Sequence, residues 1–392
     1  MAAAESPLLQ VYAPPEQIFE RGEGCWIWDD KGEKYLDCIA GIAVNALGHA
    51  SPVLVKALTE QAGKLWHTSN MFKVKGQTTL AEKYVATSFA EVVFFTNSGT
   101  EAIEGCLKLT RKYHSANGAP ERIDIIGFQG AFHGRSYAAI NAAGNPSYVD
   151  GFGPRLPGYI NVPFGDLDAV KAAIGPNTAG IIIEPVQGEG GVRAVPEGFL
   201  KALRQLADEN GFLLIFDEVQ SGAGRTGKLW AHEWEGVTPD VMAVAKGVGG
   251  GFPMGAFMAT RNAAKGMVKG VHGTTFGGNP LAMAVGNAVF DEISKPEFLE
   301  RVRAISNHLG QSLEGLKDRH PDLVVDVRGK GLLRGLKLKI DPKDVQAKLR
   351  ARKVLVGVAG DNVLRLAPPL IINEAQIGQA IDALDLALAD SK

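Results

Sequence analysis

The sequence predicts an α/β protein whose large domain contains a doubly wound, mostly parallel sheet and is followed by a smaller α+β domain. Five short apolar runs recur between residues 92 and 244, and helical patterns separate several of them. Beyond residue 290 the pattern changes to long helices followed by short strands. Parallel strands are buried on both faces and are therefore continuously apolar. Their alternation with helices favours a parallel sheet covered on both faces.

The expected strands of the large domain are short runs of apolar, mainly β-branched or aromatic residues: Val92–Thr96, Ile123–Gly127, Ile181–Ile183, Leu213–Phe216 and Val241–Val244. We expect helices at Glu101–Tyr113 and Glu197–Glu209. In the second helix, Pro196 suits the first turn and Gly211 suits the end. Residues 181–216 then form one β–α–β unit of the usual size.

The C-terminal part has a different pattern, with helical periodicity at 281–293 and 297–316 and three expected strands, Leu323–Val327, Gly335–Lys339 and Val363–Leu366. We therefore expect three segments. Residues 1–55 form an N-terminal segment that packs with the small domain, residues 56–288 form the large domain, and residues 289–392 form the small α+β domain.

Composition bounds the class of protein. The 392 residues are 45% hydrophobic and 21% charged, which excludes a mainly disordered chain, and the net charge of −2 argues against a nucleic-acid binder. No run of about 18 apolar residues predicts a membrane span. The three cysteines indicate neither a disulfide framework nor a zinc site, and Met1–Gln10 lacks the features of a secretion signal. We expect a cytoplasmic enzyme without a metal.

Polar segments follow each of the five expected strands: Asn97–Thr100, Phe132–Arg135, Glu184 with Gln187–Gly191, Asp217–Gln220, and Lys246. Ligands of open α/β sheets bind beyond the carboxyl ends of the strands. We therefore expect these segments to line one edge of the sheet and to form the functional site.

The residue types at this edge suit one cofactor. Ser98, Gly99 and Thr100 precede a helix, whose first N–H groups and dipole favour a phosphate. Asp217 ends an apolar strand, where a carboxylate needs a cation or a donor such as a protonated pyridine nitrogen. A partly buried Lys246 with a lowered pKa could condense with an aldehyde. Each feature alone is typical of ordinary structure, but phosphate, pyridine and aldehyde together are the three handles of pyridoxal phosphate (PLP).

At these residues the chain resembles the class III PLP-dependent aminotransferases of the fold-type I group. The resemblance extends from Trp26 to Leu370 and rests on these motifs: Trp28-Asp29, Tyr35–Asp37, Leu47–His49, Asn97–Ala102, Phe132–Arg135, Glu184–Gly191, Asp217–Gln220, Gly224–Gly227, Lys246, His272–Pro280 and Arg365. It implies that the large domain binds PLP.

The resemblance also implies roles for the residues around the cofactor ring. Lys246 would hold PLP covalently and later shuttle a proton. Asp217 would pair with the pyridinium nitrogen, and Gln220 would bond the phenolic oxygen. Phe132 would stack on one face of the ring and Val219 would press on the other.

A second set of implied roles concerns the phosphate and the subunit interface. Ser98, Gly99 and Thr100 would bind the phosphate in the same subunit. Thr275 would complete this site from the second subunit, with Thr274 nearby on the substrate side. The resemblance therefore implies a homodimer with shared active sites.

Three charged residues would bind substrate. Arg135 would hold a substrate carboxylate with its bidentate guanidinium group. Glu189 would neutralise Arg365 when the amino donor reacts at its side-chain end. It would swing aside when glutamate or 2-oxoglutarate needs Arg365 for its α-carboxylate. One site would then serve two substrates in a ping-pong cycle.

Within the family, Gly41–Val44, His67–Asn70 and the compact length are most similar to the members that act on N-acetylornithine. These produce N-acetylglutamate 5-semialdehyde and glutamate in arginine biosynthesis. Ile42 stands where ornithine aminotransferases carry Tyr, which disfavours ornithine but does not exclude GABA. Succinylornithine and other ω-amino acids stay open.

Two other classes of protein compete with this interpretation. Gly222–Gly227 matches the G-x-G-x-x-G pattern of NAD-dependent oxidoreductases, with Asp240 suitably spaced after it. However, Asp217 and Glu218 would repel a pyrophosphate, and Lys228–Glu235 gives a poor apolar helix face. A non-catalytic metabolite-binding protein would not need two carboxylate-binding arginines. The histidines within glycine-containing motifs are expected to form structural hydrogen bonds rather than to bind metal: His49, His133 and His272.

Overall fold

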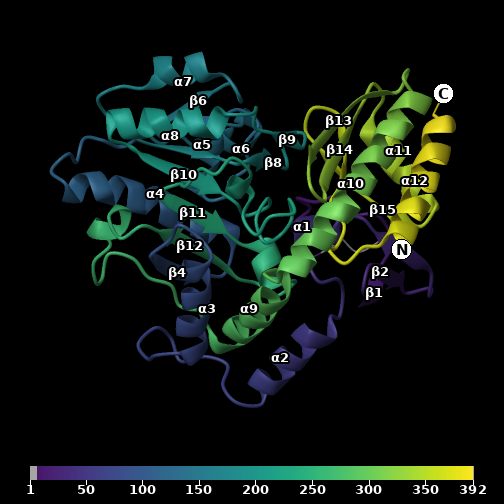
Figure 1. Ribbon diagram of the computed structural model, residues 1–392, viewed down its shortest axis with the longest axis horizontal. Coiled ribbons are helices and arrows are strands. Elements are labelled where there is room, and N and C mark those ends of the chain that lie inside the picture. The colour runs from purple at the N-terminus through teal and green to yellow at the C-terminus, as the bar shows by residue number, and fades with distance from the viewer. Residues whose placement is uncertain (1–6, 392) are drawn as a thin grey trace.

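The computed structural model describes residues 7–391, which form a large lobe and a small lobe side by side (Figure 1). Helices α9 (Pro280–Ile293) and α10 (Pro296–Arg319) follow one another from the large lobe into the small one. Among the described residues, no helix is both long and apolar enough to cross a membrane.

The large lobe is built on a seven-stranded sheet. Its spatial order is β4 (Val92–Thr96), β12 (Gly255–Ala259), β11 (Val241–Val244), β10 (Leu213–Asp217), β7 (Thr178–Ile183), β5 (Asp124–Phe128) and β6 (Tyr159–Val162). Only β12 runs antiparallel to its neighbours. The predicted mostly parallel sheet is therefore confirmed. Strand β12 was missed because its sequence, Gly-Ala-Phe-Met-Ala, has no β-branched residue, and the short β6 was also missed.

Helices cover both faces of this sheet and enclose a separate apolar core on each. Five helices bound one core: α2 (Pro52–Ala62), α3 (Lys75–Ala86), α7 (Leu167–Ala173), α8 (Phe199–Asn210) and α9. The other core is bounded by α4 (Gly99–Ala116), α5 (Tyr137–Ala143) and the 3₁₀ turn η3 (Ala263–Gly266). Helix α8 begins two residues later than expected, because Gly198 precedes it in a left-handed conformation and leaves Pro196 outside. Gly211 ends it, as the sequence predicted.

The small lobe combines an antiparallel sheet with three helices. The sheet contains β13 (Val324–Lys330), β14 (Leu333–Leu338), β17 (Val363–Leu366) and β16 (Gly357–Ala359), and the helices are α10, α11 (Pro342–Ala351) and α12 (Glu374–Ala389). Strands β13 and β14 differ by up to three residues at their ends from the expected runs. The reason is a tight hairpin, in which Gly331 adopts a φ of +65° between the two strands.

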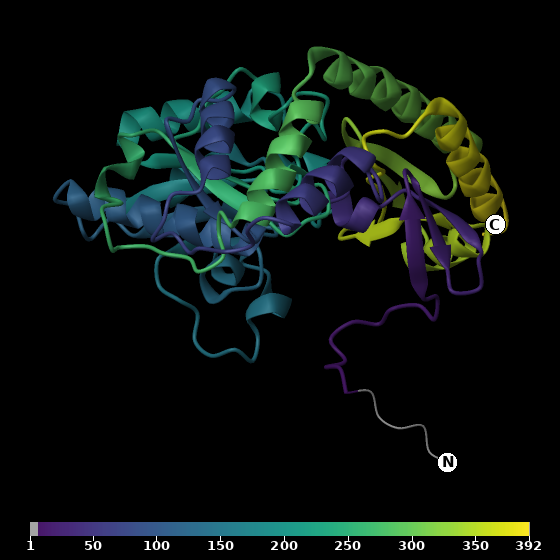
Figure 2. The same ribbon diagram turned by 90° about the horizontal axis from the view of Figure 1, so that it is seen from below.

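The N-terminal part of the chain contacts the small lobe. Strands β1 (Phe19–Glu23), β2 (Trp26–Asp29) and β3 (Lys34–Asp37) form a sheet that β15 (Val354–Leu355) extends, with Leu36 opposite Val354. Residues 7–17 lead away from both lobes (Figure 2). The expectations for the N-terminal segment and the small domain also covered residues 1–6 and 392, which lie outside the described residues.

Candidate active site

The two residues on which the sequence argument depends lie at the ends of adjacent strands. Asp217 is the last residue of β10, which pairs in parallel with β11. Lys246 follows β11 and opens the 3₁₀ turn η2 (Lys246–Gly249). A cavity of about 330 Å³ lies at this edge. Its walls include eight of the predicted site residues: Ser98, Gly99, Thr100, Phe132, Asp217, Val219, Gln220 and Lys246.

One wall of the cavity is the N-terminus of α4. Ser98 caps the helix by accepting a hydrogen bond from the Glu101 N–H group at 3.3 Å. The other N–H groups of a first helical turn have no partner within the helix and attract an anion. At Gly99 a side chain would not fit, because a Cβ atom would lie 2.8 Å from Cγ1 of Val219. This close approach brings the helix start beside the segment that follows Asp217.

The Asp217 carboxylate is buried and held on both sides. Its Oδ2 atom lies 2.7 Å from Nδ1 of His133, and its Oδ1 atom accepts a hydrogen bond from the Val219 N–H group at 3.0 Å. His133 was expected to form a structural hydrogen bond, but the identity of its partner was not predicted. His133 and Asp217 both lie in polar segments that follow expected strands, and this shared position is the sequence signal that could have indicated their contact. His133 therefore orients the acid that faces the cavity.

Lys246 provides an amine with an unusually low pKa. Burial lowers the pKa to about 8, and the charge of Arg365 lowers it as well, whereas Glu189 and Asp217 act in the opposite direction. At pH 7 about a tenth of this lysine is then uncharged, far more than for a solvent-exposed lysine. An uncharged amine is the nucleophilic form and can also accept a proton.

Glu184 is a cavity residue to which the sequence argument gave no role. It directly follows the apolar run Ile181–Ile183 of β7 and is buried, and its carboxyl accepts hydrogen bonds from the N–H groups of Phe132 at 3.1 Å and Gly188 at 3.4 Å. Burial, with the nearby charge of Asp217, raises its pKa well above the usual value. Glu184 therefore keeps its proton to a higher pH than a solvent-exposed glutamate would.

The predicted pair Glu189 and Arg365 lies beside the cavity. Arg365, on β17, is buried, and its Nη1 atom is 2.5 Å from Oε1 of Glu189 and 3.3 Å from Oε1 of Gln220. Burial raises the pKa of Glu189, but the charge and hydrogen bond of Arg365 outweigh it and leave the pKa lowered. The Glu189 carboxylate is therefore ionised and neutralises the charge of Arg365.

The other predicted substrate residues lie at the rim. Arg135 is exposed, and its guanidinium carbon lies 3.9 Å from the ring centre of Tyr148 and 5.5 Å from that of Phe132. Thr274 contacts Asn97, which lines the cavity, through their side chains at 3.5 Å. Thr275 is exposed and does not line this cavity within the single subunit.

Comparison with known proteins identifies the family. The family described as Aminotransferase class-III matches residues 10–388. The chain belongs to the class-III aminotransferases. It is 59% identical to acetylornithine aminotransferase 2 of Caulobacter vibrioides, covering 97% of this chain and 94% of that protein. It is 56% identical to acetylornithine aminotransferase of Rhodobacter capsulatus, covering 97% of each.

Solved structures of class-III aminotransferases share this architecture. N-acetylornithine aminotransferase from Stenotrophomonas maltophilia superposes with a TM-score of 0.85 at 37% identity, covering 96% of this chain and 97% of that one. Ornithine aminotransferase from Toxoplasma gondii gives a TM-score of 0.94 at 30% identity, covering 98% and 93%. The fold is therefore the PLP-dependent fold-type I.

The cofactor of class-III aminotransferases is PLP, and the cavity residues fit it. The open helix start at Ser98–Thr100 suits the phosphate, and the lack of a side chain at Gly99 keeps the approach close. The buried carboxylate of Asp217 suits a protonated ring nitrogen. The amine of Lys246 suits the aldehyde. All three groups border the same cavity.

The dinucleotide-binding alternative is wrong. Gly222–Gly227 lies in consecutive turns, and the next regular element is only the short 3₁₀ turn η1 (Ala231–Trp234). Arg225 within this segment is buried and donates hydrogen bonds to the carbonyls of Leu332 and Pro368 in the small lobe. The segment therefore joins the lobes and does not form the strand–turn–helix that binds a pyrophosphate.

Two histidines weighed as metal ligands also have polar partners. Nε2 of His49 is 2.7 Å from Oδ2 of Asp37, and Nδ1 of His272 is 2.9 Å from Nζ of Lys108. Within residues 7–391, no three His, Cys, Asp or Glu side chains are grouped suitably for a metal ion.

Proposed function

We propose that this aminotransferase transfers the terminal amino group of N-acetylornithine to 2-oxoglutarate, giving N-acetylglutamate 5-semialdehyde and glutamate. The observation that carries the reaction type is the ion pair of the buried Arg365 with the partly buried Glu189 beside the cavity of Lys246. The curated relatives support the choice of donor, because proteins 52–59% identical over at least 97% of this chain are named acetylornithine aminotransferases.

The chain's own groups can perform the proton transfers. PLP supplies an electron sink that stabilises negative charge on the carbon bearing the amino group. Lys246, with a pKa of about 8, would take the proton from that carbon and deliver it to the aldehyde-derived carbon of the cofactor, and it would reverse this transfer in the other half-reaction. Asp217, oriented by His133, would hold the proton on the pyridine nitrogen. Phe132 and Val219 line the cavity and limit the position of the ring.

Substrate carboxylates are assigned to the two arginines. Arg135, at the exposed rim, binds the α-carboxylate of N-acetylornithine, whose terminal amine then reaches Lys246. Glu189 meanwhile keeps Arg365 neutralised. When 2-oxoglutarate binds, Glu189 moves aside and Arg365 binds its α-carboxylate. The Nε atom of Arg365 is buried without a partner in the described part of the chain, so it is free to add a second hydrogen bond.

The same proposal includes an assembly, a location and a domain division. The exposure of Thr275, next to Phe276 with 59% of its surface exposed, supports a homodimer in which Thr275 reaches the partner's phosphate site. We propose a cytoplasmic enzyme of arginine biosynthesis. We also propose the division at residues 55 and 288, supported by the pairing of β3 with β15 and by the separate apolar cores of the two lobes.

A substrate panel tests the function. The values of kcat/KM for N-acetylornithine, N-succinylornithine, ornithine and GABA are measured with 2-oxoglutarate as acceptor. We expect N-acetylornithine to give the highest value. Ornithine should fall at least about tenfold lower, because Ile42 offers no polar contact and about 1.4 kcal/mol corresponds to a factor of ten. A higher value for GABA or N-succinylornithine would replace the proposed donor.

A further inference from the structure

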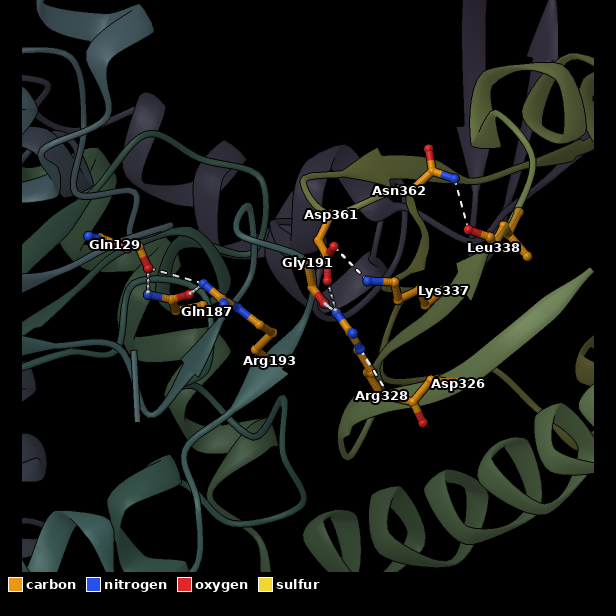
Figure 3. A network of polar contacts seen from close by, with 10 residues as sticks. All are labelled: Gln129, Gln187, Gly191, Arg193, Asp326, Arg328, Lys337, Leu338, Asp361 and Asn362. Atoms are coloured by element: carbon orange, nitrogen blue, oxygen red, sulfur yellow. Dashed lines mark hydrogen bonds and ion pairs between the residues drawn. The ribbon is translucent and has the colours of Figure 1, made fainter. Parts of the chain in front are cut away.

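Glu189 sits at the tip of a hairpin that bridges the two lobes. The hairpin consists of β8 (Val186–Gln187), the tip 188–192 and β9 (Arg193–Ala194). Its base is fixed to the large lobe, because Arg193 donates hydrogen bonds to the carbonyl of Gln129 at 3.0 Å and to Oε1 of Gln187 at 2.6 Å. Figure 3 shows this cluster on one side of the network. Arg193 therefore anchors the base to the large lobe, while Val186 of β8 also packs in an apolar cluster with Leu333 and Val363 of the small lobe.

The tip of the hairpin is held by a turn of the small lobe, residues 360–362 between β16 and β17. The carbonyl of Glu189 accepts a hydrogen bond from the Gly360 N–H group at 2.7 Å. Gly191 adopts a φ of +107°, and a Cβ atom there would lie 2.9 Å from the carbonyl oxygen of Gly360. The backbones of the tip and the turn thus touch without intervening side chains.

Charged side chains fix this turn. Asp361 forms ion pairs with Arg328 of β13 at 2.7 Å and with Lys337 of β14 at 2.6 Å, and Arg328 reaches towards the carbonyl of Gly191 at 3.5 Å (Figure 3). Asn362 donates hydrogen bonds to the carbonyls of Leu338 at 2.8 Å and Ile340 at 2.6 Å. The hydrogen bond from Lys337 lowers the pKa of Asp361, burial opposes it and Arg328 adds to the lowering, so this carboxylate is charged at neutral pH.

The turn is connected to both members of the Glu189–Arg365 pair. It holds Glu189 through the backbone hydrogen bond of Gly360, and it leads directly into β17, which carries Arg365. Fixing the turn therefore fixes the separation between the Glu189 backbone and the Arg365 guanidinium group. With the backbone fixed, only the side chain of Glu189 needs to rotate between the two substrates.

We propose that Asp361, with Arg328 and Lys337, is a positioning residue that sets the balance between the two half-reactions. The proposal rests on the proposed function, because it concerns the exchange of Glu189 between two substrates. Without the ion pairs of Asp361 the tip loosens and Glu189 neutralises Arg365 less completely. The half-reaction with the amino donor requires this neutralisation. The half-reaction with 2-oxoglutarate requires Glu189 to leave and so loses less.

The test measures the two half-reactions of the holoenzyme separately by stopped-flow absorbance of the cofactor. We expect Asp361→Ala to lower the ratio of specificity constants, donor over 2-oxoglutarate, about fivefold, mainly through the donor's KM. Asp361→Asn and Lys337→Met should change it in the same direction by less. If Asp361→Ala unfolds below the assay temperature, these two milder variants are used to test the proposal instead.

Asp385→Asn is the matched control. It removes a carboxylate of the same lobe that pairs with His320 and Arg319 away from the hairpin. We expect it to leave the ratio unchanged. A ratio within twofold of wild type in all the Asp361 and Lys337 variants, or an equal shift in the control, would overturn the proposal. The ratio can be measured with whichever ω-amino donor the wild-type enzyme prefers. A wild-type enzyme that rejects N-acetylornithine would therefore refute the proposed donor and leave this inference testable.

Discussion

Replacing Asp217 by Asn tests the centre of the proposed mechanism. The substitution preserves size but removes the negative charge that lies 2.7 Å from Nδ1 of His133 and faces the cavity. One oxygen can still accept the hydrogen bond from Val219, so the local backbone should stay in place. The interaction that is lost is the one with the ring nitrogen of the cofactor, because a buried carboxylate no longer stabilises the proton on that nitrogen. A hydrogen bond to a charged group contributes about 1.5–3 kcal/mol.

This free energy corresponds to a decrease in kcat of about 10- to 100-fold. The assay is steady-state transamination at saturating concentrations of both substrates, with PLP in excess so that weaker cofactor binding does not limit the rate. Asp240→Asn is the matched control. Asp240 precedes β11, at the end of that strand opposite to Lys246, and its carboxylate accepts hydrogen bonds from Arg204 and from the Leu214 N–H group. A kcat for Asp217→Asn within twofold of wild type would refute the role of this acid.

Four further outcomes are expected. Lys246→Ala should abolish turnover while PLP still binds non-covalently, and an undiminished kcat would contradict the proton-transfer role. Cofactor-free Lys246→Met should be more stable than wild type at pH 7 by about 3 kcal/mol, because burial lowers the pKa of Lys246 from 10.5 to about 8. Between pH 8 and 10.5 this lysine is protonated in the unfolded chain but not in the folded one, so the stability difference between the variant and wild type should shrink as the pH rises through this range. Thermal melts measure this difference, and a value that stays constant with pH would contradict the lowered pKa of Lys246. Arg365→Ala should raise the KM for 2-oxoglutarate at least about tenfold and should raise the KM for the amino donor less, because only 2-oxoglutarate loses a charge-assisted hydrogen bond. Equal increases of the two KM values in initial-rate kinetics would count against the exchange of Glu189. Tyr148→Leu should raise the donor's KM about two- to fivefold at constant kcat, since a cation–π contact with Arg135 contributes about 0.5–1 kcal/mol, whereas an unchanged KM would remove Tyr148 from the site.

The central part of the fold was predictable because its strands are buried on both faces. Such strands have continuous apolar sequences, and the polar residue after each one marks the edge where a ligand binds. This rule identified Asp217 and Lys246, which the structure places at the ends of adjacent strands. Their residue types and positions indicated a pyridine nitrogen and an aldehyde as partners, the family resemblance implied their roles in the reaction, and those roles stay predictions.

Other features depend on contacts between distant segments, which local sequence patterns do not reveal. The partner of His133 is 84 residues away in the chain, and Glu189 bonds Arg365 across 176 residues. Glu184 could have been found, because an acid directly after an apolar run is costly unless it is bonded or neutral. The position of Thr275 depends on a second subunit, so a single chain cannot complete it.

Backbone strain near the cavity explains why local propensity fails there. Lys246 has a φ of +51°, and Ala40, Ile42 and Ala43 have left-handed values in the short turn α1 (Ala40–Ala43), which leads into the cavity residue Val44. Each such conformation costs about 1–2 kcal/mol in a residue other than glycine. Glycine adopts such conformations without strain, yet glycine at 246 would remove the amine on which the proposed mechanism depends. At Lys246 the strain is retained because the reaction needs the amine, and at the buried Ala40 and Ala43 the packing of the surrounding residues holds the backbone in place.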